Sequence, residues 1–158
     1  MPNPRWFVLV SAALLTWPVL AGCSSKNAHG YRLVPVTGVV RYNGQPLADA
    51  HVTFTNTAAN VSAYARSDAN GRFTLTTFEP GDGAVPGHQT VSVSKVQVIV
   101  AGDPNIDRTT TPVPRSAETQ RRWLIPERYG SMETSGLTAE VTDGGKNEIV
   151  LELVGDVK

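Results

Sequence analysis

The chain has 158 residues, of which 41% are hydrophobic and 18% are charged, and its 14 Lys and Arg balance 14 Asp and Glu. That length suits about one domain with its own hydrophobic core. Nucleic-acid-binding proteins normally present a basic face, so the neutral balance argues against a nucleic-acid partner. The single cysteine excludes an internal disulfide.

The first 22 residues have the pattern of a secretory signal peptide. Arg5 precedes an apolar run over residues 6–20 that is too short to span a bilayer comfortably. Leu20-Ala21-Gly22-Cys23 closes this run and resembles a bacterial lipobox. The resemblance implies cleavage before Cys23 and attachment of a diacylglyceryl group to its thiol.

A lipid on Cys23 would anchor the mature chain to a membrane, because each buried CH2 contributes about 0.8 kcal/mol and two or three acyl chains hold durably. Residues 23–33 are then a polar, lipidated tether, and residues 34–158 form the exported domain. In Gram-negative lipoproteins, an aspartate directly after the lipidated cysteine favours retention in the inner membrane. This chain has Ser24 at that position, which favours the outer membrane. No other cysteine remains for thiol catalysis or metal binding.

From residue 34 the pattern becomes that of β-strands. Residues 36–42 alternate, with one face formed by Val36, Gly38, Val40 and Tyr42. Asn43-Gly44 predicts a turn with positive φ. The next strand, residues 51–55, directs Val52 and Phe54 to the core.

Two further segments predict a hairpin and a broken strand. Residues 63–67 and 72–77 flank a hairpin loop over 68–71, with Phe73 and Leu75 inward. Valines in the run 89–100 change from odd to even positions, which predicts a β-bulge or a break near Ser94-Lys95.

The rest of the chain predicts a long loop and a final hairpin. Residues 101–122 lose all periodicity and contain several prolines and threonines, which is typical of a mobile loop. Strands over 137–142 and 148–154 are expected to pair through residues 143–147, with Ile149, Leu151 and Leu153 inward. No helical periodicity is present in the mature chain.

About seven short strands with turn-rich connections predict an all-β fold, an antiparallel Ig-like sandwich. Residues 36–40, 44–47, 50–54 and 67–75 resemble carboxypeptidase regulatory-like domains, which implies a transthyretin-like β-sandwich. Residues 125–129 and 134–137, with the closing strands, resemble small exported lipoproteins of the planctomycete type. These motifs are turns and core positions, so they indicate a fold and not a chemistry.

Residues 68–79 contain some of the features of a calcium-binding loop. Asp68, Asn70 and Glu79 have the spacing of ligands in such a loop. However, Arg72 takes the fifth ligand position and Phe73 replaces the required glycine, so a turn without metal is the prediction.

Catalytic residues are also not predicted. His29, His51 and His88 lack a nucleophile in a recognisable motif. Residues 128–131 resemble the terminal motif of hydroxyisourate hydrolases, but their order is altered and 27 residues follow. We therefore expect no enzyme activity and no cofactor.

Trp123 is the remaining candidate. With Arg121, Arg122 and Tyr129 it could form a stacking platform for sugars or a partner, or Trp123 and Ile125 could plug one end of the sandwich. The function expected is a non-enzymatic structural or protein-interaction module in the cell envelope, with an envelope protein or polysaccharide as partner. A carbohydrate-binding or small-ligand-binding lipoprotein is the alternative.

Overall fold

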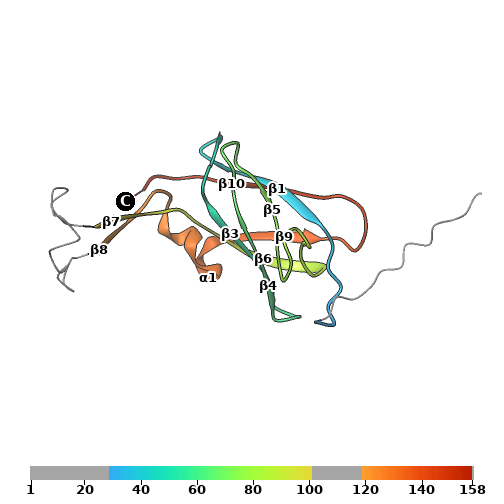
Figure 1. Cartoon of the computed structure of the whole chain (residues 1–158). Helices are drawn as coiled ribbons and strands as arrows, with labels where there is room; N and C mark the ends of the chain where they lie inside the picture. The colour runs from blue at the N-terminus through green and yellow to red at the C-terminus, as the bar shows by residue number, and fades with distance from the viewer. Residues whose placement is uncertain (1–28, 101–118, 158) are drawn as a thin grey trace, which may run out of the picture.

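The structure is a computed structural model that describes residues 29–100 and 119–157. The expected signal peptide, Cys23 and residues 101–118 of the expected loop lie outside the described residues. Within them, two four-stranded sheets form a sandwich, and a separate pair of strands extends from it (Figure 1). No helix of the described residues is long and apolar enough to cross a membrane.

The strands are distributed between the sheets without regard to their order along the chain. One sheet holds β10 (Asn147–Leu153), β1 (Val36–Tyr42), β2 (Gln45–Pro46) and β5 (Arg72–Thr74). The other holds β4 (Val61–Arg66), β3 (His51–Asn56), β6 (Gly87–Ser94) and β9 (Leu137–Val141). The extending pair is β7 (Val96–Val100) with β8 (Thr119–Trp123). The all-β sandwich is confirmed.

One hydrophobic core lies between the two sheets, and the predicted alternation places its residues correctly. Val36 and Val40 of β1 are fully buried, as is Phe54 of β3. The Phe54 ring lies 6.0 Å from the ring of Phe73 on the opposite sheet, measured between centroids. Burying large apolar side chains from both sheets is the main stabilisation of this fold.

Gly38 lets this core close. A Cβ atom at Gly38 would lie 2.2 Å from the carbonyl oxygen of Ile149 and 2.5 Å from Cζ of Phe73. The Phe73 ring therefore occupies the space of a side chain on the neighbouring strand. The turn after β1 also forms as predicted, since Asn43 and Gly44 have φ values of 50° and 78°.

Of the two predicted hairpins, one forms in part and the other does not form. An antiparallel bridge joins Tyr64 to Thr76 around the turn over residues 68–71, but β4 pairs along its length with β3 and β5 pairs with β1, so this connection also crosses between the sheets. The second hairpin is wrong, because residues 142–146 connect β9, which pairs with β6, to β10, which pairs in parallel with β1. Alternation shows which side of a strand is buried, but it does not identify the neighbouring strand.

The segment after β6 is partly as predicted. β6 ends at Ser94 and β7 begins at Val96, which confirms the break. The loop prediction is wrong for residues 119–122, because they belong to β8. Two four-residue helices follow, η1 (Glu127–Gly130) and α1 (Met132–Ser135), and both are too short to give a helical pattern in the sequence.

Candidate functional site

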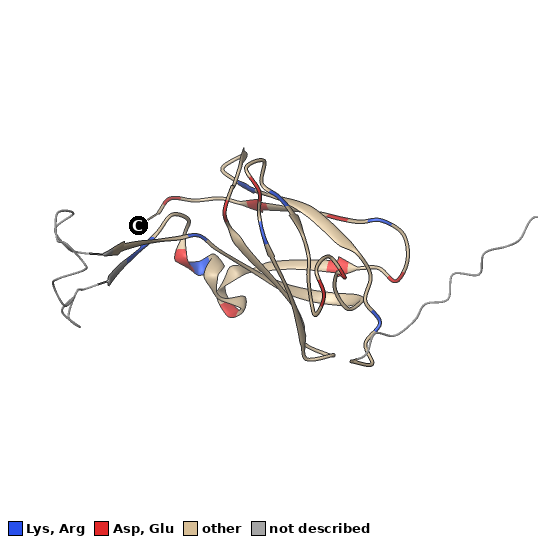
Figure 2. Ribbon diagram, in the orientation of Figure 1, with Lys and Arg blue, Asp and Glu red and all other residues tan. Residues whose placement is uncertain are grey.

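The β7–β8 ribbon presents both apolar and basic side chains to solvent. Val98 is 58% exposed and Ile99 is 40% exposed. Arg121 and Arg122 are exposed as well, and neither strand contains Asp or Glu (Figure 2). Among the described residues, neither arginine forms an ion pair. The ribbon is therefore a positively charged surface that retains apolar contact area.

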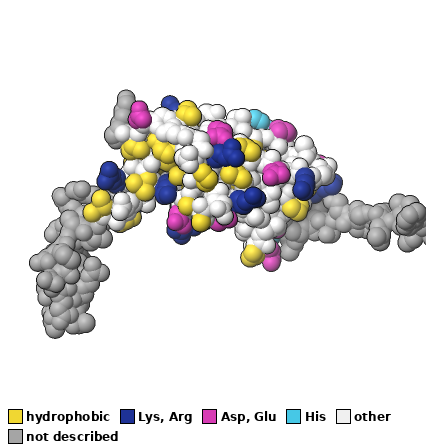
Figure 3. All heavy atoms as spheres, turned by 90° about the horizontal axis from the view of Figure 1, so that it is seen from above, with side chains coloured by type: hydrophobic (Ala, Val, Ile, Leu, Met, Phe, Trp, Pro, Cys, Tyr) yellow, Lys and Arg dark blue, Asp and Glu magenta, His cyan; other side chains and the backbone are white. Residues whose placement is uncertain are grey.

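Each face of the ribbon combines the two kinds of side chain. Cross-strand partners lie on the same face, and Val98 is directly opposite Arg121. Arg122 lies on the other face opposite Gln97, with Ile99 one alternation further along β7. Figure 3 shows hydrophobic and basic side chains beside one another at the end of the molecule that carries the ribbon.

Trp123 lies at the base of the ribbon and lines a pocket of about 500 Å³. Its indole packs against Gly130, where a Cβ atom would lie 2.6 Å from Cη2 of the indole. Trp123 itself remains partly exposed, whereas Ile125 is fully buried. Ile125 is therefore buried, as expected for a residue that plugs the end of the sandwich. Trp123 is only partly buried, and its indole also forms one wall of the pocket. The other lining residues are Pro126, Glu127, Arg128, Gly155, Asp156 and Val157.

Arg128 supplies the positive charge of this pocket. Its Nη2 donates to the carbonyl of Val154 at 2.8 Å and to the hydroxyl of Tyr129 at 2.9 Å. The Tyr129 hydroxyl in turn donates to the Val154 carbonyl at 3.0 Å, and the tyrosine is buried. The guanidinium lies 4.8 Å from the centre of the Tyr129 ring. This network holds Arg128 in place beside the C-terminal tail.

The stacking platform that the sequence left open as an alternative to the plug thus differs from the pocket that forms. Arg121 shares the ribbon face of Trp123, Arg122 lies on the opposite face, and Tyr129 is buried below Arg128. Sequence reasoning missed Arg128 and residues 155–157 as pocket residues. Residues 155–157 are held beside Trp123 by hydrogen bonds between residues far apart in the sequence, including one from the Tyr42 hydroxyl to the Gly155 carbonyl at 2.6 Å. No local sequence pattern predicts such bonds.

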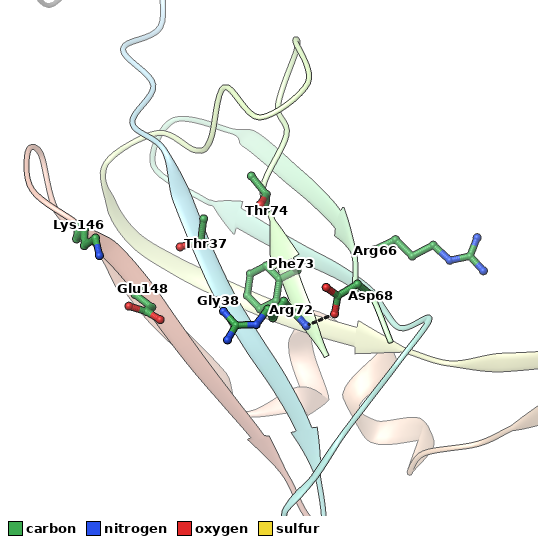
Figure 4. Close-up of a pocket in the computed structure, with 9 residues that line it drawn as sticks. All are labelled: Thr37, Gly38, Arg66, Asp68, Arg72, Phe73, Thr74, Lys146 and Glu148. Atoms are coloured by element: carbon green, nitrogen blue, oxygen red, sulfur yellow. Dashed lines mark hydrogen bonds between the residues drawn. The ribbon is translucent and has the colours of Figure 1, made fainter. Parts of the chain in front are cut away.

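A second concavity, of about 670 Å³, lies over the sheet that contains β1 (Figure 4). Arg72, Lys146 and Glu148 line it with both signs of charge, and Figure 4 shows Arg66 pointing away from the others. Asp68 accepts hydrogen bonds from the backbone N–H groups of Asn70 and Arg72, both at 2.8 Å. This carboxylate stabilises the turn expected in place of a calcium loop. Mixed charges on an open surface are typical of a solvated face.

Two carboxyl groups of the described residues, those of Asp82 and Glu133, have a lowered pKa, and both bond to neighbouring residues of a turn or a helix start. Burial opposes ionisation of Asp82, but hydrogen bonds from the backbone N–H groups of residues 77–79 outweigh it and hold the pKa of this carboxyl below its usual value. The Ser131 hydroxyl lowers the pKa of Glu133 at the start of α1. No group of three or more His, Cys, Asp or Glu in the described chain could hold a metal ion.

The three histidines lie on different parts of the domain. His51 is exposed on β3, and His88 of β6 lies 3.6 Å from Glu140 of β9, where both side chains are exposed. His29 stacks on Phe78, with 4.0 Å between the ring centroids. The three histidines therefore do not belong to one cluster.

Comparisons with known proteins support the fold. Residues 35–111 match the family model described as carboxypeptidase regulatory-like domain, which confirms the resemblance seen in the sequence. No curated protein matches the chain. The solved structure of a 9R-lipoxygenase from Cyanothece PCC8801 is similar at 16% identity over 78% of this chain and 16% of that chain, with a TM-score of 0.36. Such a TM-score is too low to relate the two proteins.

Proposed function

We propose that this chain is a lipid-anchored, exported β-sandwich that acts as a non-enzymatic interaction module of the cell envelope. The lipobox-like Leu20-Ala21-Gly22-Cys23 supports the lipid anchor, and Ser24 supports the outer membrane as its location. The match to a carboxypeptidase regulatory-like domain supports the sandwich as a module. Its partner is an envelope protein or polysaccharide.

The exposed β7–β8 ribbon is the observation that carries the proposal. A two-stranded ribbon alone is marginally stable in water, so its strands gain stability when another surface covers them. Val98 and Ile99 offer apolar area, and Arg121 and Arg122 favour an anionic partner. In Figure 1 the ribbon extends away from the point where the described chain begins, so an anchored domain would present it away from the lipid.

A non-enzymatic role is supported by how the ionisable groups are used. Asp68 and Asp82 accept hydrogen bonds from the backbone of turns, and Glu133 bonds to the residue before α1. Perturbed carboxylates in enzymes instead converge in a cleft. The match to a regulatory-like family agrees with binding rather than catalysis.

Binding of a carbohydrate or another small ligand is the second candidate, and the Trp123 pocket favours it. An indole wall beside the Arg128 guanidinium can stack on a sugar ring and bond to its polar groups. Trp123 is the only tryptophan after residue 22, so ligand-induced quenching of its fluorescence would report binding directly. Saturable quenching by an envelope saccharide without any protein adduct at the ribbon would favour this candidate.

Site-specific photo-crosslinking in the cells that make the protein tests the first candidate. A photoreactive residue at position 98 should capture one discrete partner, and Arg121→Glu with Arg122→Glu should reduce that adduct strongly. The matched control is position 150 on the flank of β10, where Val150 is 55% exposed. Equal capture at both positions, or none at position 98, would contradict a partner surface on the ribbon.

A further inference from the structure

Three aromatic side chains gather where the described chain enters the sandwich. The rings of His29 and Phe78 stack with centroids 4.0 Å apart and an angle of 23° between their planes. The Tyr31 ring stacks on Phe78 as well, at 6.0 Å and 26°. We call His29, Tyr31 and Phe78 the tether cluster. Phe78 stays 39% exposed in spite of both contacts, so the cluster keeps apolar surface in water.

The loop that carries Phe78 is held firmly. The Asp82 carboxylate accepts hydrogen bonds from the backbone N–H groups of Thr77, Phe78 and Glu79, at 2.7, 2.9 and 2.8 Å. Thr77 adds a bond from its hydroxyl to the Gly83 carbonyl at 2.6 Å. These hydrogen bonds fix the backbone of the turn, so the Phe78 side chain is held in its exposed position.

The same end of the sandwich carries a second apolar surface. A shallow depression is lined by residues 56–59 and 85–88, which include Ala58, Ala59, Val85 and Pro86. It adjoins the start of the domain, because Ala84 and Val34 exchange backbone hydrogen bonds of 3.0 Å. In Figure 1 the β3–β4 turn and the start of the described chain lie at the same end, away from the ribbon.

The distance to the expected lipid is short. Cys23 precedes His29 by six residues, and a fully extended chain spans at most about 3.3–3.6 Å per residue. Cys23 therefore lies within about 22 Å of His29 in the tether cluster whatever path the chain takes. A lipid on Cys23 would place its glyceryl group at the membrane surface, so the cluster would stay within reach of that surface.

We infer that the tether cluster docks into the interfacial region of the bilayer that holds the Cys23 lipid; this inference rests on the proposed lipid anchor. Aromatic side chains with an apolar body and a polar edge favour the membrane–water interface. The domain then lies against the membrane with its ribbon directed outward. It does not move freely at the end of an eleven-residue tether spanning residues 23–33.

Charges near the cluster predict which lipids suffice. Arg32 is paired with Asp143 at 2.6 Å, and Glu79 and Asp82 flank Phe78. No unpaired cation among the described residues of this loop attracts anionic headgroups. Docking should therefore occur on zwitterionic phosphatidylcholine and should not require anionic phosphatidylglycerol.

Fluorescence quenching by brominated lipid tests the inference on the full chain made in cells. The processed protein is reconstituted into phosphatidylcholine vesicles with and without bromine on the acyl chains. Phe78→Trp adds an emitter in the cluster, and Val154→Trp, at a residue 58% exposed beside the distal pocket, is the matched control. We expect brominated lipid to remove most of the emission added at position 78 and almost none at position 154 or from Trp123.

The outcomes separate the inference from the anchor. Intact mass is measured first; an unmodified Cys23 contradicts the proposed anchor, and the inference falls with it. A lipidated protein whose position 78 is quenched no more than position 154 overturns the inference alone. Tyr31→Trp is the second probe in case Phe78→Trp loses its β-type circular dichroism, and it should be quenched in the same way.

Discussion

Replacing Phe73 with alanine should remove most of the stability of the domain. Phe73 is 4% exposed, its ring lies 6.0 Å from Phe54, and it fills the space above Gly38. Truncating a buried phenylalanine to alanine typically costs about 3–5 kcal/mol. Since a domain is stable by about 5–15 kcal/mol, the loss is a large part of the whole. At this chain length, the melting temperature should fall by roughly 10–20 °C.

The matched control is Thr74→Ala, the next residue of the same strand. Thr74 is exposed on the opposite face, so its truncation should cost less than about 1 kcal/mol. Urea and thermal unfolding of residues 23–158, followed by far-UV circular dichroism, would measure both differences. Equal losses of stability from the two substitutions would refute the assignment of Phe73 to the inner face.

Two other perturbations test local contacts. Gly130→Ala should displace the Trp123 indole, because the new Cβ atom would lie 2.6 Å from the indole ring, while φ at this glycine is ordinary. The tryptophan emission should shift to longer wavelength with little change in melting temperature. Unchanged emission would contradict the contact. Asp82→Asn should destabilise the domain near neutral pH. Because the folded pKa of Asp82 lies below its ordinary value of 3.8, its contribution is present above that value and is lost as the pH falls through the folded pKa. Unfolding curves of both proteins should therefore converge in acid, and a difference that persists there would show that the carboxylate charge is not responsible.

The sequence predicted which side of each core strand is buried. Val36, Val40, Val52 and Phe54 alternate with exposed or half-buried neighbours, and the period of two leaves only one face for the core. Asn43-Gly44 predicted its turn because few other residues accept a positive φ. In each case the signal lies within a few adjacent residues.

Strand partners and pocket residues could not be predicted in this way. β10 pairs in parallel with β1, more than 100 residues earlier, and no short pattern encodes such pairing. The sequence predicted a loop at β8, because the side chains of this strand lie on an exposed ribbon and do not alternate between core and solvent. Arg128 joins the Trp123 pocket only because the C-terminal tail returns beside η1 through its bonds to Val154 and Gly155.

The intact mass of the protein extracted from the membranes of cells that express the full chain tests the lipid anchor most directly. We expect a chain that begins at Cys23, carries the added mass of a diacylglyceryl group and partitions into the detergent phase. Cys23→Ala should abolish both. A wild-type protein that retains residues 1–22, or that begins at Cys23 without added mass, would contradict the proposed lipid anchor.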